Sequence, residues 1–196
     1  PDFWDKLHFY WMNSILSGPI TQARNILGNL GTSLFSPVQR LGAAAIEQPL
    51  ALAQGRQAQR FWQEAPASVV GIFQGMPEGV RAALTTLRTG ISPRAAAKLD
   101  LHRAAPIGGP AGRVLGFPTT MLGVMDEFFS AINYRSALNA EAVRMARIEG
   151  LQGEALRNRI AELVTNPPPS LMKRVTQEAE NLVFRGDPGD VARAAA

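Results

Sequence analysis

The stretch 121–148, MLGVMDEFFSAINYRSALNAEAVRMARI, decides the fold class of this 196-residue chain. Large apolar residues recur in it at steps of three and four, the spacing of one face of an α-helix. The stripe consists of Met121, Met125, Phe128, Ile132, Leu138, Ala142, Met145 and Ile148, with Arg135 as its one polar member. We therefore expect a helix of about eight turns that stops at Gly150.

Toward the amino terminus, proline and glycine predict shorter helices. Asp2 can cap a helix over 2–17, which Gly18-Pro19 breaks. After a second piece over 19–35, Ser36-Pro37 is expected to restart a helix, and Gln48-Pro49 to interrupt it before a run to about Trp62. The apolar face of 19–35 consists of Ile20, Ala23, Ile26, Leu27 and Leu30.

Proline and glycine also mark the expected helices on either side of the long one. Pro66 opens a helix, Pro77 suits the first turn of the next, and Gly90 stops it. Two more helices are expected over 154–165 and 170–185, separated by the prolines at 167–169 and ended by Gly186. Strand-like alternation never exceeds about four residues. The sequence predicts an all-α fold of short-to-medium helices in an irregular or extended bundle.

The domain organisation follows from composition. We expect an amino-terminal helical region over 1–103, low in charge and then basic, and a second helical region over 119–186. Between them, 104–118 (AAPIGGPAGRVLGFP) is the least regular stretch and predicts a linker or hinge. Residues 187–196 are expected to form a frayed tail.

Charge is unevenly placed along the chain, whose formal net charge is +4. Residues 7–39 hold one formal charge, Arg24, whereas the stretch 81–113 sets six basic residues against Asp100. The candidates for contacts with phosphate are Arg81, Arg88, Arg94, Lys98, Arg103 and Arg113. The competing interpretation is an ordinary solvated face, because this stretch lacks the interleaved aromatic residues on which bases stack.

Aromatic residues are concentrated at 3–11, FWDKLHFYW, where Trp4, Tyr10 and Trp11 are candidates for a protein interface or a membrane surface. Burial in the core is the plain alternative. Further interface candidates on the long helix are Met125, Phe128, Phe129 and Ile132. A membrane span needs about 20 mostly apolar residues, and polar residues interrupt every window of 7–39. Insertion as an oligomer, with polar residues toward a lumen, stays open.

The residues from which active sites are built are scarce or badly spaced. There is no cysteine, and His8 and His102 have no partners at metal-ligand spacing. The adjacent carboxyls of Asp126 and Glu127 point about 100° apart on a helix and cannot converge on one reacting atom. We therefore expect no catalytic residue, no cofactor and no metal site, and a protein that assembles with partners.

Two segments carry a resemblance to a known family. WDKLHFYWMNSILSGPITQARNILGNL at 4–30 resembles a "W…LLSGPxTxxxNxxGN" run of very large multidomain proteins from tailed bacteriophages, and MDEFFSAINYRSALNAEAVRMARIEG at 125–150 resembles a helix downstream in them. The first match rests on Trp11, Leu16, Ser17, Gly18, Pro19, Thr21, Asn25, Gly28 and Asn29. The second rests on Asp126, Phe128, Phe129, Ile132, Tyr134, Arg135, Leu138 and Ala142. Ser130 and Ala137 depart from the family pattern, which has a lysine and an acid there.

The resemblance implies an internal virion (ejection) protein, stored near the portal and released with the genome to form a conduit across the host envelope. It implies self-association, contacts with the portal or further ejection proteins, and contacts with DNA and the host membrane. Two other hypotheses stay open: a nucleic-acid-binding module that uses 81–113, and a non-catalytic helical appendage of a large virion enzyme.

Overall fold

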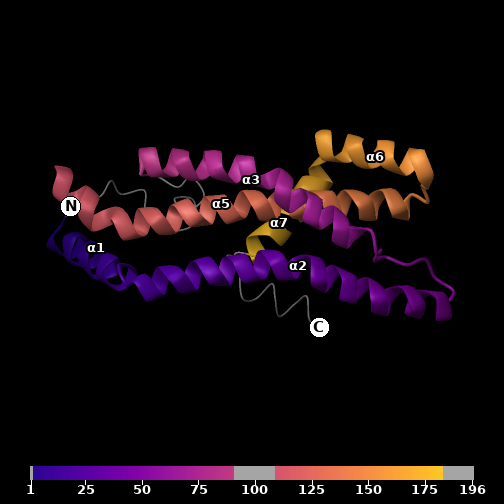
Figure 1. Ribbon diagram of the computed structural model, residues 1–196, viewed down its shortest axis with the longest axis horizontal. Coiled ribbons are helices and arrows are strands. Elements are labelled where there is room, and N and C mark those ends of the chain that lie inside the picture. Colours follow the sequence, from indigo (N-terminus) through magenta and orange to yellow (C-terminus); the bar gives the residue numbers. More distant parts are fainter. Residues whose placement is uncertain (1, 91–108, 183–196) are drawn as a thin grey trace.

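Helices account for most of the described chain, which in this computed structural model comprises residues 2–90 and 109–182. The helices are α1 (Phe3–Leu16), α2 (Pro19–Ala53), α3 (Glu64–Thr89), α5 (Gly109–Ile148), α6 (Gly153–Thr165) and α7 (Pro169–Leu182). No strand occurs within these two ranges. The predicted all-α fold is confirmed. Figure 1 shows long helices lying side by side along one axis, with α6 along the carboxyl-terminal end of α5 and α7 crossing nearer the middle of the molecule, between α5 and α2.

Three of the expected breaks at proline are wrong. Pro37 and Pro49 lie inside α2, and Pro77 lies inside α3, so each helix continues as one long element. A proline removes one helix hydrogen bond, and contacts with neighbouring helices can outweigh that loss. The run expected to reach Trp62 also ends earlier, at Ala53.

Other boundaries agree with the sequence. Gly18 and Pro19 separate α1 from α2, and Pro19 occupies the first helical position. Gly90 ends α3 in a left-handed conformation (φ 70°), which glycine adopts without strain, and donates its amide hydrogen to the Thr86 carbonyl at 2.8 Å. Gly150, also left-handed, follows α5. The expected end at Gly186 and the tail at 187–196 lie outside the described residues.

The linker predicted for 104–118 is wrong for its last ten residues, because 109–118 form the first turns of α5. Helix α1 packs on these turns. Thr119 donates its hydroxyl hydrogen to Asn13 Oδ1 at 2.6 Å, and the Phe9 ring lies against Gly116, where an added Cβ would come within 3.2 Å of it. Gln22 further donates to the Pro118 carbonyl at 3.3 Å. These contacts order a segment whose own composition disfavours helix. Residues 104–108 lie outside the described part of the chain.

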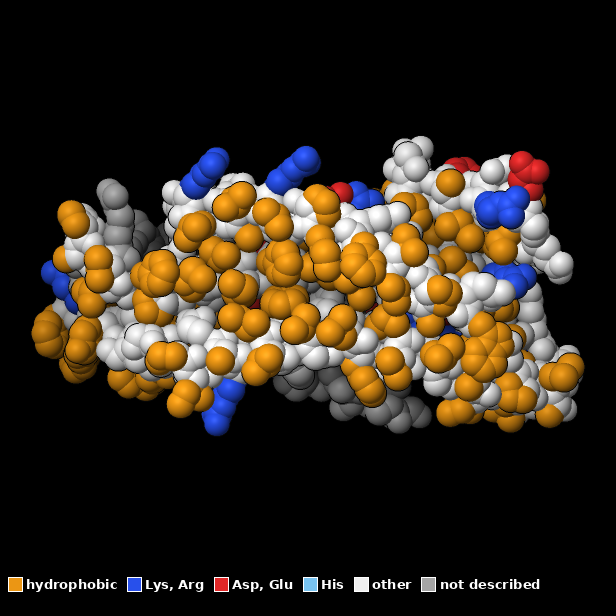
Figure 2. Space-filling model, in the orientation of Figure 1, with side chains coloured by type: hydrophobic (Ala, Val, Ile, Leu, Met, Phe, Trp, Pro, Cys, Tyr) orange, Lys and Arg blue, Asp and Glu red, His pale blue; other side chains and the backbone are white. Residues whose placement is uncertain are grey.

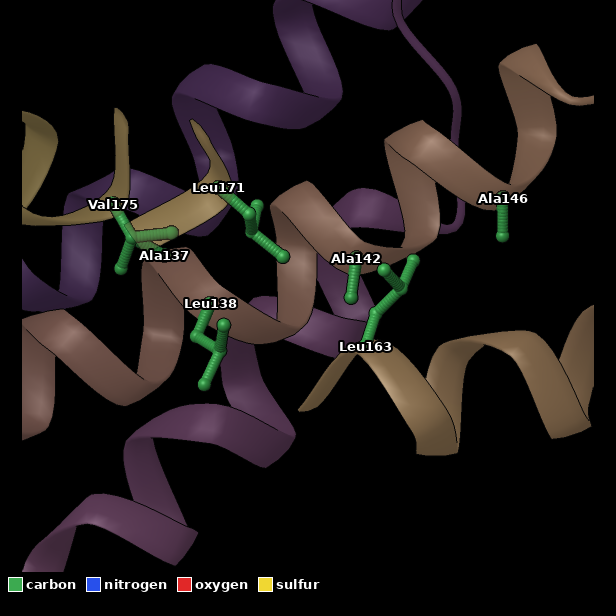
Figure 3. Close-up of a cluster of buried hydrophobic side chains, with 7 residues drawn as sticks. All are labelled: Ala137, Leu138, Ala142, Ala146, Leu163, Leu171 and Val175. Atoms are coloured by element: carbon green, nitrogen blue, oxygen red, sulfur yellow. The ribbon is translucent and has the colours of Figure 1, made fainter. Parts of the chain in front are cut away.

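Helix α5 is the axis of the fold, and every other described helix contacts it. Helix α3 runs antiparallel to it, since Gly71, Gly75 and Gly79 meet α5 at successively earlier positions, from Ser136 to Phe128. The apolar core lies in the carboxyl-terminal part of α5, where α6 and α7 pack against it (Figure 3). Its fully buried members are Ala137, Leu138, Ala142, Ala146, Leu163, Leu171 and Val175.

Candidate assembly surface

Helix α2 turns its polar residues inward and its large apolar residues outward. The buried residues of the helix are Asn29, Ser33, Ser36, Arg40, Ala44 and Ala51. Its exposed large apolar residues are Ile20, Leu27, Leu30, Leu34, Phe35, Val38, Leu41, Ile46, Leu50 and Leu52. A surface helix of a self-sufficient globular protein has the opposite arrangement, with its apolar stripe against the core.

Helix α3 packs on α5 through glycine rather than through large side chains. A Cβ added to Gly71 would lie 2.3 Å from the Arg135 carbonyl oxygen, and one added to Gly75 would lie 2.8 Å from the Ile132 Cα. The two backbones are therefore so close that only hydrogen fits between them at these positions. One turn before Gly71, the hydroxyls of Ser68 and Ser136 hydrogen-bond at 2.6 Å in the buried contact.

Because small residues occupy most of the inner face of α3, its large apolar residues other than the buried Ile72 lie on the outer one. They are Val69, Val70, Phe73, Met76, Val80, Leu84 and Leu87, all exposed. Figure 2 shows apolar side chains spread over this face of the molecule. Exposed apolar surface of this extent marks an interaction site in soluble proteins. We call the outward residues of α2 and α3 the outer apolar surface.

Charged residues lie between four helices in the interior. The Glu64 carboxylate of α3, 1% exposed, lies 2.6 Å from an Arg144 Nη on α5 and 3.5 Å from an Arg40 Nη on α2. Arg40 also pairs with Glu178 of α7. Buried charges are unfavourable unless they are paired. The cluster therefore favours the packing of the four helices in which each of these charges has its partner. No sequence motif indicated it.

A second carboxylate joins the same cluster from α5. Glu141 pairs with Arg144 and lies 3.8 Å from the guanidinium of Arg174. Burial raises the pKa of Glu141, and the charge of Arg144 only partly offsets this. Burial alone lowers the pKa of Arg144, but the hydrogen bond to Glu64 and the charge of Glu141 raise it more. These charges pair with one another across the contacts between helices.

The predicted aromatic candidates on α1 are exposed. Trp4, Tyr10 and Trp11 are each more than half exposed, and the Phe3 ring meets the Trp4 ring edge-on at 5.8 Å between centroids. His8 is exposed beside Trp11. Among the described residues, Phe9 of this cluster packs against Gly116, whereas Trp4, Tyr10 and Trp11 are not buried. Their assignment to an interface or membrane surface stays a prediction.

Two of the four candidates on α5 are wrong as exposed interface residues. Phe129 and Ile132 are buried, the latter where Gly75 meets α5. Met125 and Phe128 are half-buried, and the Phe128 ring lies against Gly79. The apolar stripe of α5 serves packing within the chain because α5 is the central helix.

The phosphate candidates are described only in part. Arg81 and Arg88 are exposed on α3, seven residues and therefore two turns apart on one side of the helix. Arg94, Lys98 and Arg103 lie outside the described residues, and Arg113 lies in the first turns of α5. Of the six, the described residues place only Arg81 and Arg88 on one side of a helix.

Other features suited to chemistry are few. Within 2–90 and 109–182, no group of three or more His, Asp or Glu side chains is placed to hold a metal ion. An open hollow of about 400 Å³ is lined by Phe61, Trp62, Arg56 and Arg147 among others, and the Arg147 guanidinium lies 6.0 Å from the Phe61 ring centre. Arg56 is paired with Glu47. None of the helices described is long and apolar enough to cross a bilayer.

Comparisons with protein families, with curated proteins and with solved structures found no match to this chain.

The outer apolar surface was not predicted, because a helical repeat of apolar residues does not show whether that face points toward the core or toward solvent. The signal that could have shown it is the spacing of Gly71, Gly75 and Gly79. Three glycines four residues apart define a face for close helix contact, which leaves Val69, Phe73 and Val80 on the other side.

Proposed function

We propose that this chain is a structural assembly module of a tailed-bacteriophage internal virion (ejection) protein. It is stored inside the particle, associates with copies of itself and with the portal or further ejection proteins, and helps to form the genome-delivery conduit across the host envelope. DNA and the host membrane are further proposed contacts. The phage part rests on the resemblance at 4–30 and 125–150, and the assembly part rests on the structure.

One observation carries the assembly part. The helices α2 and α3 bury mostly Ser, Asn, Gly, Ala and charged residues, with Ile72 as the one buried large apolar residue, while most of their Leu, Val, Ile and Phe residues face outward. Burial of apolar surface is the main favourable term in folding and in association. A chain that leaves so much apolar surface outside is completed by another surface, either protein or lipid.

The assembly part is tested by light scattering of the full chain over a concentration series, alone and with anionic liposomes that are afterwards floated on a density gradient. We expect a defined oligomer, co-flotation with liposomes, or both. A matched control replaces exposed polar residues outside the outer apolar surface, such as Arg157 and Lys173, with serine and should behave as the parent. A monomer at every concentration that stays away from liposomes contradicts the proposal.

The phage part needs a separate measurement. Mass spectrometry of purified particles, before and after triggered release of the genome, should find the protein in full particles and not in emptied ones. Its retention in emptied capsids, or its absence from full ones, contradicts the ejection role.

Binding of nucleic acid is the second candidate. It is supported by the exposed pair of Arg81 and Arg88 on one side of α3. A phosphate-binding role predicts DNA affinity that falls steeply with salt, and replacing Arg88, Arg94 and Lys98 with glutamine should reduce the slope of log K against log salt by up to about 0.9 per lost contact. Salt-insensitive binding contradicts it.

A further inference from the structure

The outward residues of α2 form a seam with a coiled-coil spacing. Ile20 is followed at steps of 3, 4, 3, 4, 4, 3 and 4 by exposed apolar residues, as the exposure of each position shows. They are Ala23, Leu27, Leu30, Leu34, Val38, Leu41 and Ala45. Alternating steps of three and four are the pattern by which one helix packs along another. The one extra step of four spans Pro37, where a local change of winding is expected.

Three glycines lie on the exposed side of α2, each directly after a leucine of the seam. Among the described residues, a Cβ added to Gly28, Gly31 or Gly42 would meet nothing within 4 Å. By contrast, a Cβ at Gly71 would collide with the backbone of α5. Glycine in an exposed helix is less favourable than alanine. Close approach of a second helix to α2 would explain these three residues in the way that α5 explains the glycines of α3.

The seam is self-complementary when two copies of α2 run in opposite directions. Pairing about the midpoint between Leu30 and Leu34 sets Ile20 against Ala45 and Ala23 against Leu41. Leu27 then meets Val38, and Leu30 meets Leu34. A small residue faces a large one at both ends of the seam, which lets side chains interdigitate. Such a contact is isologous, the kind that closes a two-fold dimer.

Charge favours the same direction. Arg24 is the only charged residue of α2 outside the Glu64 cluster and the Glu47–Arg56 pair. In a parallel, in-register pair the two Arg24 side chains would lie at the same height along the axis, on the two edges of the seam. In the antiparallel pair Arg24 lies opposite Leu41, so the two guanidinium groups are separated by about 17 residues, or about 25 Å along the axis. The antiparallel pair thus avoids a like-charge contact.

With its flanking Phe35, the seam approaches the apolar area of a dimer contact. Six large side chains of the seam, with Phe35 next to them in the sequence, are on average about half exposed: Ile20, Leu27, Leu30, Leu34, Phe35, Val38 and Leu41. At roughly 60–120 Å² for each fully exposed side chain, they offer roughly 250–450 Å² of apolar surface per copy. A standard interface buries about 800 Å² per partner, of which somewhat more than half is apolar. A membrane surface would instead select an amphipathic helix with several basic residues, and α2 exposes only Arg24.

We propose that α2 pairs with α2 of a second copy of this chain as an antiparallel helical pair, centred between Leu30 and Leu34. This inference rests on the proposed assembly function and names its partner and geometry. This pairing explains why the leucines of α2 face solvent and why open space surrounds Gly28, Gly31 and Gly42. It also places the two Arg24 side chains far apart.

The first test is sedimentation equilibrium of the full chain carrying Leu27→Glu and Leu34→Glu together. Both residues are exposed, so far-UV circular dichroism should be unchanged, and the dimer should weaken at least 100-fold. The matched control is Val80→Glu with Leu84→Glu, which places two acids on the exposed face of α3 and should leave the dimer intact. Equal loss in both double variants, or loss in neither, overturns the proposal.

The second test measures direction. Because the chain contains no cysteine, Arg24→Cys carries a single spin label per copy. Pulsed dipolar spectroscopy should give about 27 Å between labels for the antiparallel pair and about 10 Å for a parallel one. A distance near 10 Å overturns the proposed geometry. A monomer that still floats with anionic liposomes contradicts the α2–α2 pairing but is consistent with the assembly function. A monomer that does not bind liposomes contradicts both proposals.

Discussion

The two halves of this molecule differ in where their apolar side chains point. Where α5, α6 and α7 meet, leucine, valine and alanine side chains point inward and are fully buried, as Leu138, Leu163 and Leu171 are. Along α2 and α3 the inner face carries serine, glycine and charged residues, and the leucines point away from the chain. The region where α5, α6 and α7 meet buries its large apolar residues, whereas α2 and α3 leave most of theirs exposed.

The difference shows where this fold depends on a neighbour. The α5–α7 core supplies the cohesion that allows α2 and α3 to keep one arrangement, with the charged cluster around Glu64 as the link between the halves. What α2 and α3 then present is an ordered apolar surface rather than a collapsed one.

Removing the link should have the largest effect. Glu64→Gln leaves the buried guanidinium groups of Arg40 and Arg144 facing a neutral amide, and breaking a buried pair in this way destabilises by about 3–5 kcal/mol. Urea unfolding followed by circular dichroism measures the change. Arg159→Gln is the control: it breaks exposed pairs with Glu149 and Glu162, and a loss as large as that of Glu64→Gln would show that burial is irrelevant.

The same truncation should act differently in the two halves. Leu138→Ala removes a side chain that is 2% exposed and should destabilise by about 2–5 kcal/mol. Leu34→Ala removes one that is 57% exposed and should change the stability of the dilute chain by less than about 0.5 kcal/mol. Comparable losses for the two variants would contradict the outward placement of Leu34.

The effect of replacing glycine with alanine on stability should likewise depend on the location of the glycine. Gly71→Ala forces α3 away from the α5 backbone and should destabilise by about 1–3 kcal/mol. Gly42→Ala adds a methyl group to open space in an exposed helix and should stabilise the dilute chain by about 0.5–1 kcal/mol. Thermal unfolding resolves both signs, and a stabilising Gly71→Ala would refute the close approach of the two helices.

The pH dependence should show two carboxyls acting in opposite directions. The pKa of Glu141 is raised in the folded chain by burial, so its favourable contribution is full below the usual glutamate pKa of about 4.5 and is lost as the pH rises. Glu141→Gln should therefore gain in stability relative to the parent between pH 4 and 7. The pKa of Glu78 is lowered by the hydrogen bond from Arg135, so its contribution exists above that range and is lost as the pH falls. Glu78→Gln should give the opposite slope, and equal slopes would contradict the two environments.

The sequence predicted the helices better than their packing. The stripe at 121–148, the break at Gly18-Pro19 and the stop at Gly90 are local signals, and all agree with the structure. The interruptions expected at Pro37, Pro49 and Pro77 are absent because contacts between helices override a local preference.

The candidate surface could be predicted only in part. Composition made Trp4, Tyr10 and Trp11 interface candidates but left burial in the core open, and their role stays a prediction. Phe129 and Ile132 were misplaced because a regular apolar stripe can serve either core or surface. The outward direction of Leu27 and Phe73 depends on which small residues touch α5, and the charged cluster depends on residues from four helices meeting in space. Neither is a local property of the sequence.

The central claim is that α2 and α3 point their apolar residues outward, and cysteine accessibility tests it most directly in a chain that has no cysteine of its own. Single variants at Leu34 and Phe73 should react with a maleimide in dilute solution at nearly the rate of an unfolded peptide. Ser33→Cys and Ser68→Cys, at buried positions of the same helices, should react at least 100-fold more slowly. Protection at 34 and 73 in the monomer, with rapid labelling at 33 and 68, would contradict the account.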